Sequence, residues 1–274
     1  MRQLAAAVLL AAGAACAADL QPIKDAGPYV PSPQSVVADM LRYADVSASD
    51  FLVDLGSGDG RIVLTAAKVF GARGFGVEIK DDLVKRANEA ASKEGLADRV
   101  KFMKADLFKT DISQATVITM YLLPDTVNLL KEKFLTELRP GTRIVSHDYP
   151  LTGWIPEKYV QMDLEDKVQI SGVTTTLIYL YIVPAKVAGR WEAKMPPAVS
   201  KQPATLQLKQ QLTRISGSLR VDGKDVPLED AKLRGDKLTF KLAGRKGEFS
   251  GVVKGNAIEG TVDGKSPWTA ALGG

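Results

Sequence analysis

A glycine-rich loop follows the first apolar run of the chain. Residues Val53–Arg61 read V-D-L-G-S-G-D-G-R, with three glycines at alternate positions. Glycine allows left-handed backbone conformations and close approach of a ligand to the backbone. The N-terminus of a following helix adds free N–H groups to such a site. The pattern therefore predicts a nucleotide-type cradle between a strand and a helix.

The spacing of the glycines distinguishes between two nucleotide cofactors. The dinucleotide motif is G-x-G-x-x-G, whereas here the third glycine comes one residue early and Arg61 stands at the motif's last position. Acids also flank and enter the loop, at Asp54 and Asp59. A carboxylate in the cradle repels a pyrophosphate but attracts a sulfonium with an amino-acid ammonium group. The loop thus favours S-adenosylmethionine over NAD.

Two further acids stand where the next two strands are expected to end. Glu78 is placed to accept hydrogen bonds from ribose hydroxyls, and Asp106 from an adenine amino group, with Leu107 beside the ring. Ligands of open parallel sheets bind at these carboxyl ends. The residues expected to bind the cofactor are Asp54, Gly56, Gly58, Asp59, Gly60, Glu78, Asp106 and Leu107.

Strands and helices alternate around these residues. Ser32 and Pro33 are expected to start a first helix. Near-continuous apolar strands alternating with helices predict a parallel sheet covered on both faces. Two β-prone runs, Tyr159–Ile170 and Thr174–Val183, then flank Ser171-Gly172 and predict a closing antiparallel hairpin. The expected strands are 51–55, 74–79, 100–105, 116–122 and 142–146, and the expected helices are 60–70, 81–94 and 125–138.

The helical period disappears in the last part of the chain. Short β-prone runs are separated by turn pairs such as Asp222-Gly223 and Asp263-Gly264, which predicts a small antiparallel meander or barrel. Trp191 and Trp268 bracket it and are interpreted as core residues. The expected divisions are a leader at 1–17, an α/β domain at 18–185, a linker at 186–203 and the β domain at 204–274.

Composition limits the chemistry and separates the two domains by charge. The chain has 274 residues with 45% hydrophobic and 25% charged content, typical of a globular protein. One cysteine, Cys16, and one histidine, His147, leave almost no material for disulfides, metal sites or thiol nucleophiles.

The two parts of the chain differ in net charge: residues 1–185 carry a net charge of 20 − 23 = −3 and residues 186–274 a net charge of 16 − 9 = +7. The basic β domain is expected to contact an anionic membrane surface or an acidic envelope partner, and its scattered lysines do not predict nucleic-acid binding.

The first residues resemble a secretory leader. Met1–Ala17 has an early arginine, an uncharged apolar stretch and an A-C-A cleavage pattern. The prediction is an exported or envelope-associated protein, cleaved after Ala17 or anchored by an uncleaved leader; if the leader does not function, the protein is cytoplasmic. S-adenosylmethionine is made in the cytoplasm, so export leaves the cofactor's supply as an open question.

Several motifs together resemble the class I methyltransferases. They resemble in particular the small lysine methyltransferases that include the mitochondrial enzymes modifying the adenine nucleotide translocase and the ATP synthase c subunit. The resemblance covers about Pro28–Trp154. It implies a Rossmann-like seven-stranded sheet with an antiparallel last pair, S-adenosylmethionine as cofactor and a protein lysine as acceptor. The matching segments are Y-V-P-S-P, D-L-G-S-G-D-G-R-I, G-A-R-G-F-G-V-E-I, A-D-L-F, Y-L-L-P-D and L-R-P-G-T-R-I-V-S-H-D.

Acceptor-orienting groups are expected after the fourth and fifth strands, at Tyr121, His147 and Asp148, with Tyr29 and Tyr149 as pocket walls. His147 has two interpretations, a proton acceptor or a strand-end histidine satisfied by backbone. Two other functions remain open from the residues: a non-catalytic S-adenosylmethionine-binding module, and a small-molecule O- or N-methyltransferase. No metal is expected, and the sequence does not indicate an oligomeric state.

Overall fold

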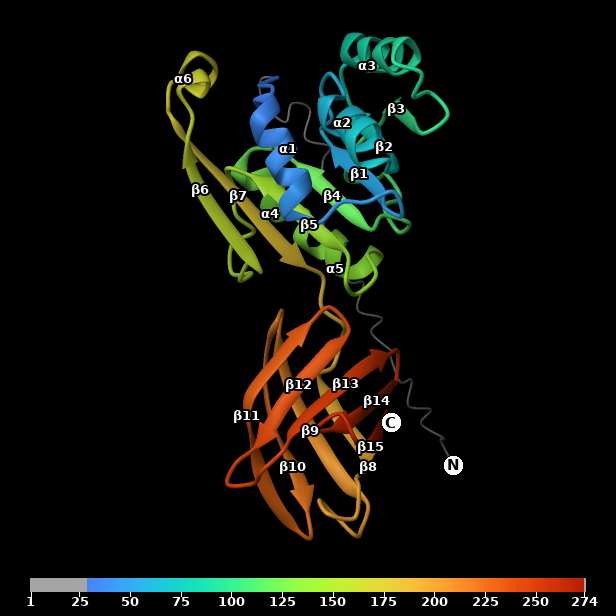
Figure 1. Ribbon diagram of the computed structural model, residues 1–274, viewed down its shortest axis with the longest axis vertical. Helices are drawn as coiled ribbons and strands as arrows, with labels where there is room; N and C mark the ends of the chain where they lie inside the picture. The colour runs from blue at the N-terminus through green and yellow to red at the C-terminus, as the bar shows by residue number, and fades with distance from the viewer. Residues whose placement is uncertain (1–28, 274) are drawn as a thin grey trace, which may run out of the picture.

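The chain forms two units, each built on its own sheet (Figure 1). The structure is a computed structural model that describes residues 29–273. The leader expected at Met1–Ala17 lies outside the described residues. Among the described residues, no helix is long and apolar enough to cross a membrane.

The first unit is a seven-stranded sheet with strand order β3-β2-β1-β4-β5-β7-β6. β7 runs antiparallel to both β5 and β6, whereas the other pairs are parallel. The predicted Rossmann-like sheet with an antiparallel end is therefore confirmed. Its elements are α1 (Gln34–Tyr43), β1 (Phe51–Leu55), α2 (Arg61–Phe70), β2 (Arg73–Glu78), α3 (Asp81–Lys93), β3 (Val100–Lys104), β4 (Val117–Met120), α4 (Pro124–Leu129), α5 (Lys131–Glu137), β5 (Arg143–His147), β6 (Lys158–Asp163), α6 (Glu165–Ser171) and β7 (Thr175–Ile182).

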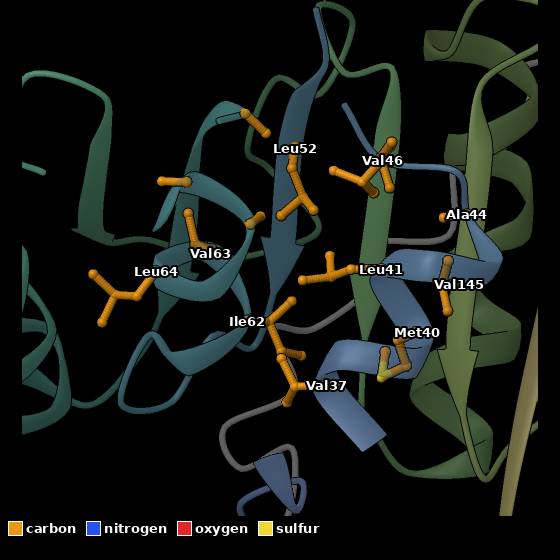
Figure 2. Close-up of a cluster of buried hydrophobic side chains, with 14 of the residues drawn as sticks. Val37, Met40, Leu41, Ala44, Val46, Leu52, Ile62, Val63, Leu64 and Val145 are labelled. Atoms are coloured by element: carbon orange, nitrogen blue, oxygen red, sulfur yellow. The ribbon is translucent and has the colours of Figure 1, made fainter. Parts of the chain in front are cut away.

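Helices cover both faces of this sheet because its central strands are apolar on both sides. Successive strand residues point to opposite faces. Leu52 of β1 packs in a core with α1, α2 and α3, and Figure 2 shows it near Leu41 and Ile62. The next residue, Val53, belongs to a second core that includes Phe134 of α5. The burial of both faces fixes the sheet as a rigid platform for the loops at its edge.

The carboxyl ends of β1 to β5 lie along one edge of the sheet. β1 pairs with β2 on one side and with β4 on the other, so the chain leaves β1 and β4 toward opposite sides. This reversal of strand order opens a crevice at the carboxyl edge. β7 runs the other way, so it carries the chain from that edge toward the second unit (Figure 1).

Two connections differ from the predicted ones. A short helix, α6, replaces the expected hairpin turn between β6 and β7, and Gly172 ends this helix in a left-handed conformation at φ 76°. The helix expected at 125–138 is two helices that meet at Leu130. The Asn128 side chain donates to the Pro124 carbonyl and so competes with the helical hydrogen-bond pattern there.

The second unit is a closed antiparallel barrel, as the turn signals predicted. Its strands follow the order β10-β11-β12-β13-β14-β15-β8-β9. Asp222 and Gly223 both have positive φ, as expected for the tight turn between β10 and β11. The strands are β8 (Gly189–Lys194), β9 (Ala204–Gln211), β10 (Arg214–Val221), β11 (Lys224–Arg234), β12 (Lys237–Leu242), β13 (Glu248–Lys254), β14 (Ala257–Val262) and β15 (Ser266–Leu272).

The segment 186–203, expected as a linker, contains the first barrel strand. β8 pairs with β9 on one side and with β15 on the other, and thereby closes the barrel. It alternates buried and exposed residues, with Trp191 fully buried. The prolines at 196 and 197 come after this strand and not before it. The barrel therefore begins earlier than predicted.

Side chains fill the barrel interior. Trp268 makes edge contacts with Phe240 and Phe249, whose rings are stacked 4.7 Å apart. Trp191 and Trp268 are both buried, which confirms their interpretation as core residues.

The barrel adjoins the edge of the sheet where the parallel strands begin. The Ala185 N–H donates to the Gly235 carbonyl at 2.8 Å, and Arg234 pairs with Glu157 at 2.7 Å. Leu212, in the β9–β10 turn, packs against the second core of the α/β unit. The carboxyl edge, where the crevice lies, therefore faces away from the barrel (Figure 1).

Candidate active site

A cleft of ≈ 990 Å³, open to solvent, lies along the carboxyl ends of β1, β2, β3 and β4. Most residues expected to bind the cofactor line it, and so does Tyr121. Gly60, His147 and Asp148 do not line it. The lining residues are Tyr29, Val30, Pro31, Ser32, Asp54, Gly56, Ser57, Gly58, Asp59, Arg61, Ile62, Val77, Glu78, Ile79, Lys80, Ala105, Asp106, Leu107, Phe108, Tyr121 and Leu122.

The glycine loop needs its glycines for conformation and for space. Gly56, Gly58 and Gly60 have φ values of 77°, 54° and 83°. A Cβ atom on Gly58 would lie 2.5 Å from the Tyr29 ring. Gly60 is the N-cap of α2 and has a left-handed backbone. Gly60 therefore shapes the loop from outside the cleft.

Asp54 is a buried carboxyl in the cleft wall. It is 2% exposed, and its Oδ1 accepts a hydrogen bond of 2.7 Å from the Thr119 hydroxyl. Burial, with added repulsion from Glu78 and Asp59, raises the pKa of Asp54 to about 7, although the Thr119 bond opposes the shift. A bound cation would favour the charged form of this carboxyl.

Glu78 ties the loop to the end of β2. Its Oε2 accepts from the Gly58 N–H at 3.0 Å, and its Oε1 accepts from the N–H groups of Ile79 at 2.8 Å and Lys80 at 3.0 Å. These bonds fix the carboxylate at the wall of the cleft, where the ribose was expected.

Asp59 lines the cleft but is already paired. Its carboxylate accepts from Arg61 Nε at 2.9 Å and from Arg61 Nη2 at 2.6 Å. Burial raises the pKa of Asp59, but Arg61 and a hydrogen bond from Tyr29 outweigh this effect and lower it. Arg61 also donates to the Ser32 carbonyl at 2.8 Å, which ties the segment before α1 to the loop. Asp59 thus supports the loop more than it supplies free negative charge.

The far end of the cleft has an acid beside apolar walls. Asp106 Oδ1 accepts from the Phe108 N–H at 2.9 Å, and Leu107 and Phe108 line the cleft beside it. Among the described residues no hydrogen bond to Asp106 Oδ2 is seen, so this oxygen can accept from a ligand. The arrangement suits the amino group and flat ring of an adenine.

Sequence reasoning missed Ser57 in the middle of the glycine loop. Ser57 is 6% exposed and lines the cleft, and its Oγ has no hydrogen-bond partner among the described residues. A buried hydroxyl without a partner is unfavourable unless a ligand satisfies it. The signal available in the sequence was a small polar residue between the first two glycines.

These residues fit S-adenosylmethionine. The unpartnered Ser57 hydroxyl and the acids Asp54, Glu78 and Asp106 together match a positively charged nucleoside. Asp54 and Ser57 would face its amino-acid part, Glu78 its ribose and Asp106 its adenine.

Tyr121 connects the cleft to a buried polar cluster behind it. Its hydroxyl donates to Asp148 Oδ2 at 3.0 Å, and its ring lies 3.9 Å from that of His147. Burial and the neighbouring Asp148 raise the pKa of Tyr121, so the hydroxyl stays protonated at neutral pH. Tyr149 stacks at 6.4 Å from Tyr121 and, unlike Tyr29, does not line the cleft.

His147 lies behind the cleft wall and is neutral. Its side chain is buried, and Nδ1 lies 2.8 Å from the Ser32 Oγ. Nε2 has no hydrogen-bond partner among the described residues and lies 3.6 Å from Asp148 Oδ1. Burial lowers the pKa of His147 to about 4, against a partial opposing effect of Asp148. Ser32, expected to cap α1, makes no capping hydrogen bond and instead faces His147.

Asp148 also lies outside the cleft, and its carboxylate is bound by other residues of the chain. Lys167 of α6 donates to Oδ1 at 2.8 Å and to Oδ2 at 2.7 Å. The Leu177 N–H also donates to Oδ1, at 3.1 Å. The sequence predicted that Asp148 orients the methyl acceptor directly. These contacts occupy its carboxylate outside the cleft, so it does not touch the methyl acceptor. Lys167 was missed because it lies on a helix that the sequence did not predict.

Known proteins match the α/β unit of this chain. Residues 54–158 match the family model of the ANTKMT methyltransferase domain. A protein-lysine N-methyltransferase of Saccharolobus islandicus is 42% identical over 57% of this chain and 93% of its own length. The mouse adenine nucleotide translocase lysine N-methyltransferase is 37% identical over 38% of this chain and 46% of its own length. The chain thus spans about half the length of this animal relative.

A solved structure shares both fold and sequence with the α/β unit. An RNA methyltransferase from Salinibacter ruber, in complex with S-adenosyl-L-homocysteine, has a TM-score of 0.52 and 46% identity. The alignment covers 58% of this chain and 96% of that one. With the Saccharolobus relative matched over nearly its whole length, this chain belongs to the family of S-adenosylmethionine-dependent protein-lysine N-methyltransferases.

Proposed function

We propose that this protein methylates the side-chain amine of a lysine in another protein. The observation that carries the proposal is Tyr121, which lines the cofactor cleft while its hydroxyl hydrogen is committed to Asp148 at 3.0 Å. The hydroxyl oxygen can therefore act only as an acceptor toward the cleft. An amine that enters the cleft is the kind of group that such an acceptor orients.

The residues of the chain bind and align more than they react. S-adenosylmethionine, when bound, supplies an electrophilic methyl group. Asp54, Glu78 and Asp106 line the cleft as acidic residues, and the parallel sheet sets the spacing of the strand ends that carry them. Correct alignment of the two reacting groups accounts for much of the rate of such a transfer.

The lysine must lose a proton before its nitrogen can accept a methyl group, because its pKa is about 10.4 in water. His147 does not line the cleft, so it does not take this proton directly. We assign the proton to water at the open mouth of the cleft. The apolar wall of Leu122 and the acceptor at Tyr121 then hold the neutral amine.

A labelled-methyl assay tests the acceptor class. The purified protein is incubated with methyl-labelled S-adenosylmethionine and separated protein and RNA fractions, and labelled protein is hydrolysed to amino acids. The proposal expects label in methyllysine, and none with a Tyr121→Phe variant that still binds the cofactor. Label that ribonuclease releases, as for the acceptor class of the Salinibacter relative, would assign the chain to RNA instead.

We also propose that the protein is exported and acts at the envelope. The leader-like sequence at Met1–Ala17 supports export, and the charge of 16 − 9 = +7 over residues 186–274 supports contact with an anionic surface. Cell fractionation and the N-terminal sequence of the isolated protein test the first point, with Ala18 as the expected first residue. Equal binding of the whole protein to anionic and neutral vesicles at low salt would contradict the second.

A further inference from the structure

Lys167 is a buried lysine at the same edge of the sheet as the cleft. It belongs to α6, at the end of the β6–β7 excursion (Figure 1). Its side chain is 3% exposed. Its ammonium group donates to both oxygens of Asp148, at 2.8 and 2.7 Å, and to the Thr175 carbonyl at 2.5 Å. A lysine is rarely buried unless it is paired in this way.

The contacts of Asp148 show what this ion pair can do. Oδ1 accepts from Lys167 and from the Leu177 N–H, and Oδ2 accepts from Lys167 and from the Tyr121 hydroxyl. A carboxylate offers about four acceptor positions, so Asp148 has none to spare for a substrate. Its only link to the cleft among these contacts is Tyr121, which lines the cleft.

We propose that Lys167 is a positioning residue for methyl transfer, acting through Asp148 on Tyr121. The ammonium group keeps the carboxylate charged and fixed, so Asp148 accepts the Tyr121 hydrogen. The Tyr121 oxygen then presents lone pairs to the incoming amine. The inference rests on the proposed lysine methylation, because an amine acceptor is what gives this orientation its use.

The pKa of Asp148 agrees with an action of Lys167 through Asp148 on Tyr121. Burial raises the pKa of Asp148, but the charge that His147 carries when protonated, the Lys167 bonds and the Leu177 N–H outweigh burial and lower it. Without Lys167, the buried carboxyl loses a charged partner and is more easily protonated. A protonated Asp148 can donate to Tyr121 and turn its hydroxyl hydrogen toward the cleft.

The competing explanation is that the ion pair only stabilises α6. The variants Lys167→Met, Lys167→Arg, Asp148→Asn and the double variant Asp148→Asn/Lys167→Met separate the two roles. Lys158→Met, at an exposed lysine on β6 of the same excursion, is the matched control. For each variant, we would measure the melting temperature, the Kd for S-adenosylmethionine, and kcat and KM for a lysine-containing acceptor.

The positioning role predicts a loss confined to the acceptor reaction. Lys167→Met is expected to lower kcat/KM for the acceptor by about tenfold or more, since small misalignments in an active site have effects of this size. The Kd for S-adenosylmethionine should change less than about twofold, and Lys167→Arg should recover most of the activity because it keeps the charge. Lys167→Met leaves the buried Asp148 carboxylate without its charged partner, and the double variant also removes that carboxylate. The melting temperature of the double variant should therefore recover, while its kcat should not. Recovery of kcat together with melting temperature in the double variant would overturn the proposal.

An NMR measurement tests whether Lys167 positions the Tyr121 hydroxyl without requiring a measurement of catalysis. The Cζ resonance of ¹³C-labelled Tyr121, assigned by Tyr121→Phe, reports the state of its hydroxyl. It should shift in Lys167→Met and in Asp148→Asn, and the double variant should add nothing to the Asp148→Asn shift, as expected for one connected network. An unchanged Tyr121 resonance in Lys167→Met would overturn the positioning role. Absence of lysine methylation by the unaltered protein, with the Tyr121 shift present, would instead overturn the proposed function.

Discussion

The backbone N–H of Gly58 donates a hydrogen bond of 3.0 Å to Glu78 Oε2 and so joins the tip of the glycine loop to the end of β2. The glycine loop and the acid expected to bind the ribose therefore form one structural unit. A change in either residue should therefore alter cofactor binding.

Replacement of Gly58 by alanine should weaken S-adenosylmethionine binding by about tenfold to a hundredfold, because strain of this kind is worth about 1–3 kcal/mol. The new Cβ would require an alanine at φ 54° and would lie 2.5 Å from Tyr29. Gly95→Ala is the matched control, since Gly95 has φ 69° but no atom within 4 Å of a new Cβ. Calorimetric titration of both variants checks the prediction, and equal affinities would contradict it.

Replacement of Glu78 by glutamine should raise the Kd for S-adenosylmethionine by about tenfold, since an unmade hydrogen bond at a polar site costs about 1–3 kcal/mol. The amide has one acceptor oxygen, whereas the carboxylate uses both oxygens for three backbone N–H groups. Glu89→Gln, at an exposed position of α3, serves as the control. The same titration compares the two variants, and an unaltered Kd in Glu78→Gln would show that the carboxylate is dispensable.

Cofactor binding should release a proton between about pH 6 and 7, because the pKa of Asp54 is raised to about 7 by burial. A carboxyl with a raised pKa is protonated below that value, and a bound cation shifts it to the charged form. Affinity for S-adenosylmethionine should consequently rise as pH increases through this range. Calorimetry in two buffers of different ionisation enthalpy measures the proton, and Asp54→Asn should remove the difference. Identical heats in both buffers for the unaltered protein would refute the assignment.

His147 should stay neutral down to about pH 4, because burial lowers its pKa to about 4 from a usual 6.5. The unfolded chain takes up a proton below pH 6.5 and the folded chain does not, so stability falls as pH drops from 6.5 to 4. The loss is roughly 3 kcal/mol over that range. The chain has one histidine, so its C2 proton gives an unambiguous NMR titration. A midpoint near 6.5 would show that the ring is not held as described.

Local sequence was sufficient for the cofactor side of the site. Each of the acids Asp54, Glu78 and Asp106 is placed by its own strand end, and the parallel sheet brings those ends to one edge. The glycine spacing likewise depends on neighbours within a few residues. Periodicity and turn residues carry this kind of information.

The polar cluster behind Tyr121 depends on contacts between distant parts of the chain. Ser32 contacts His147, which is 115 positions away in the sequence. Lys167 contacts Asp148 from a helix that lies in a stretch predicted to be β-strand. The periodicity of the sequence does not predict such contacts between distant residues. The same limit explains β8, which only its pairing with β9 and β15 identifies as a barrel strand.

The most direct test of the account is transfer of labelled methyl groups from S-adenosylmethionine by the purified protein, followed by amino-acid analysis of the labelled acceptor. We predict mono-, di- or trimethyllysine as the labelled product, with less label at sub-saturating S-adenosylmethionine in Gly58→Ala and unchanged label in Gly95→Ala. Label in RNA, label in a product other than methyllysine, or no transfer by a protein that binds the cofactor would contradict it.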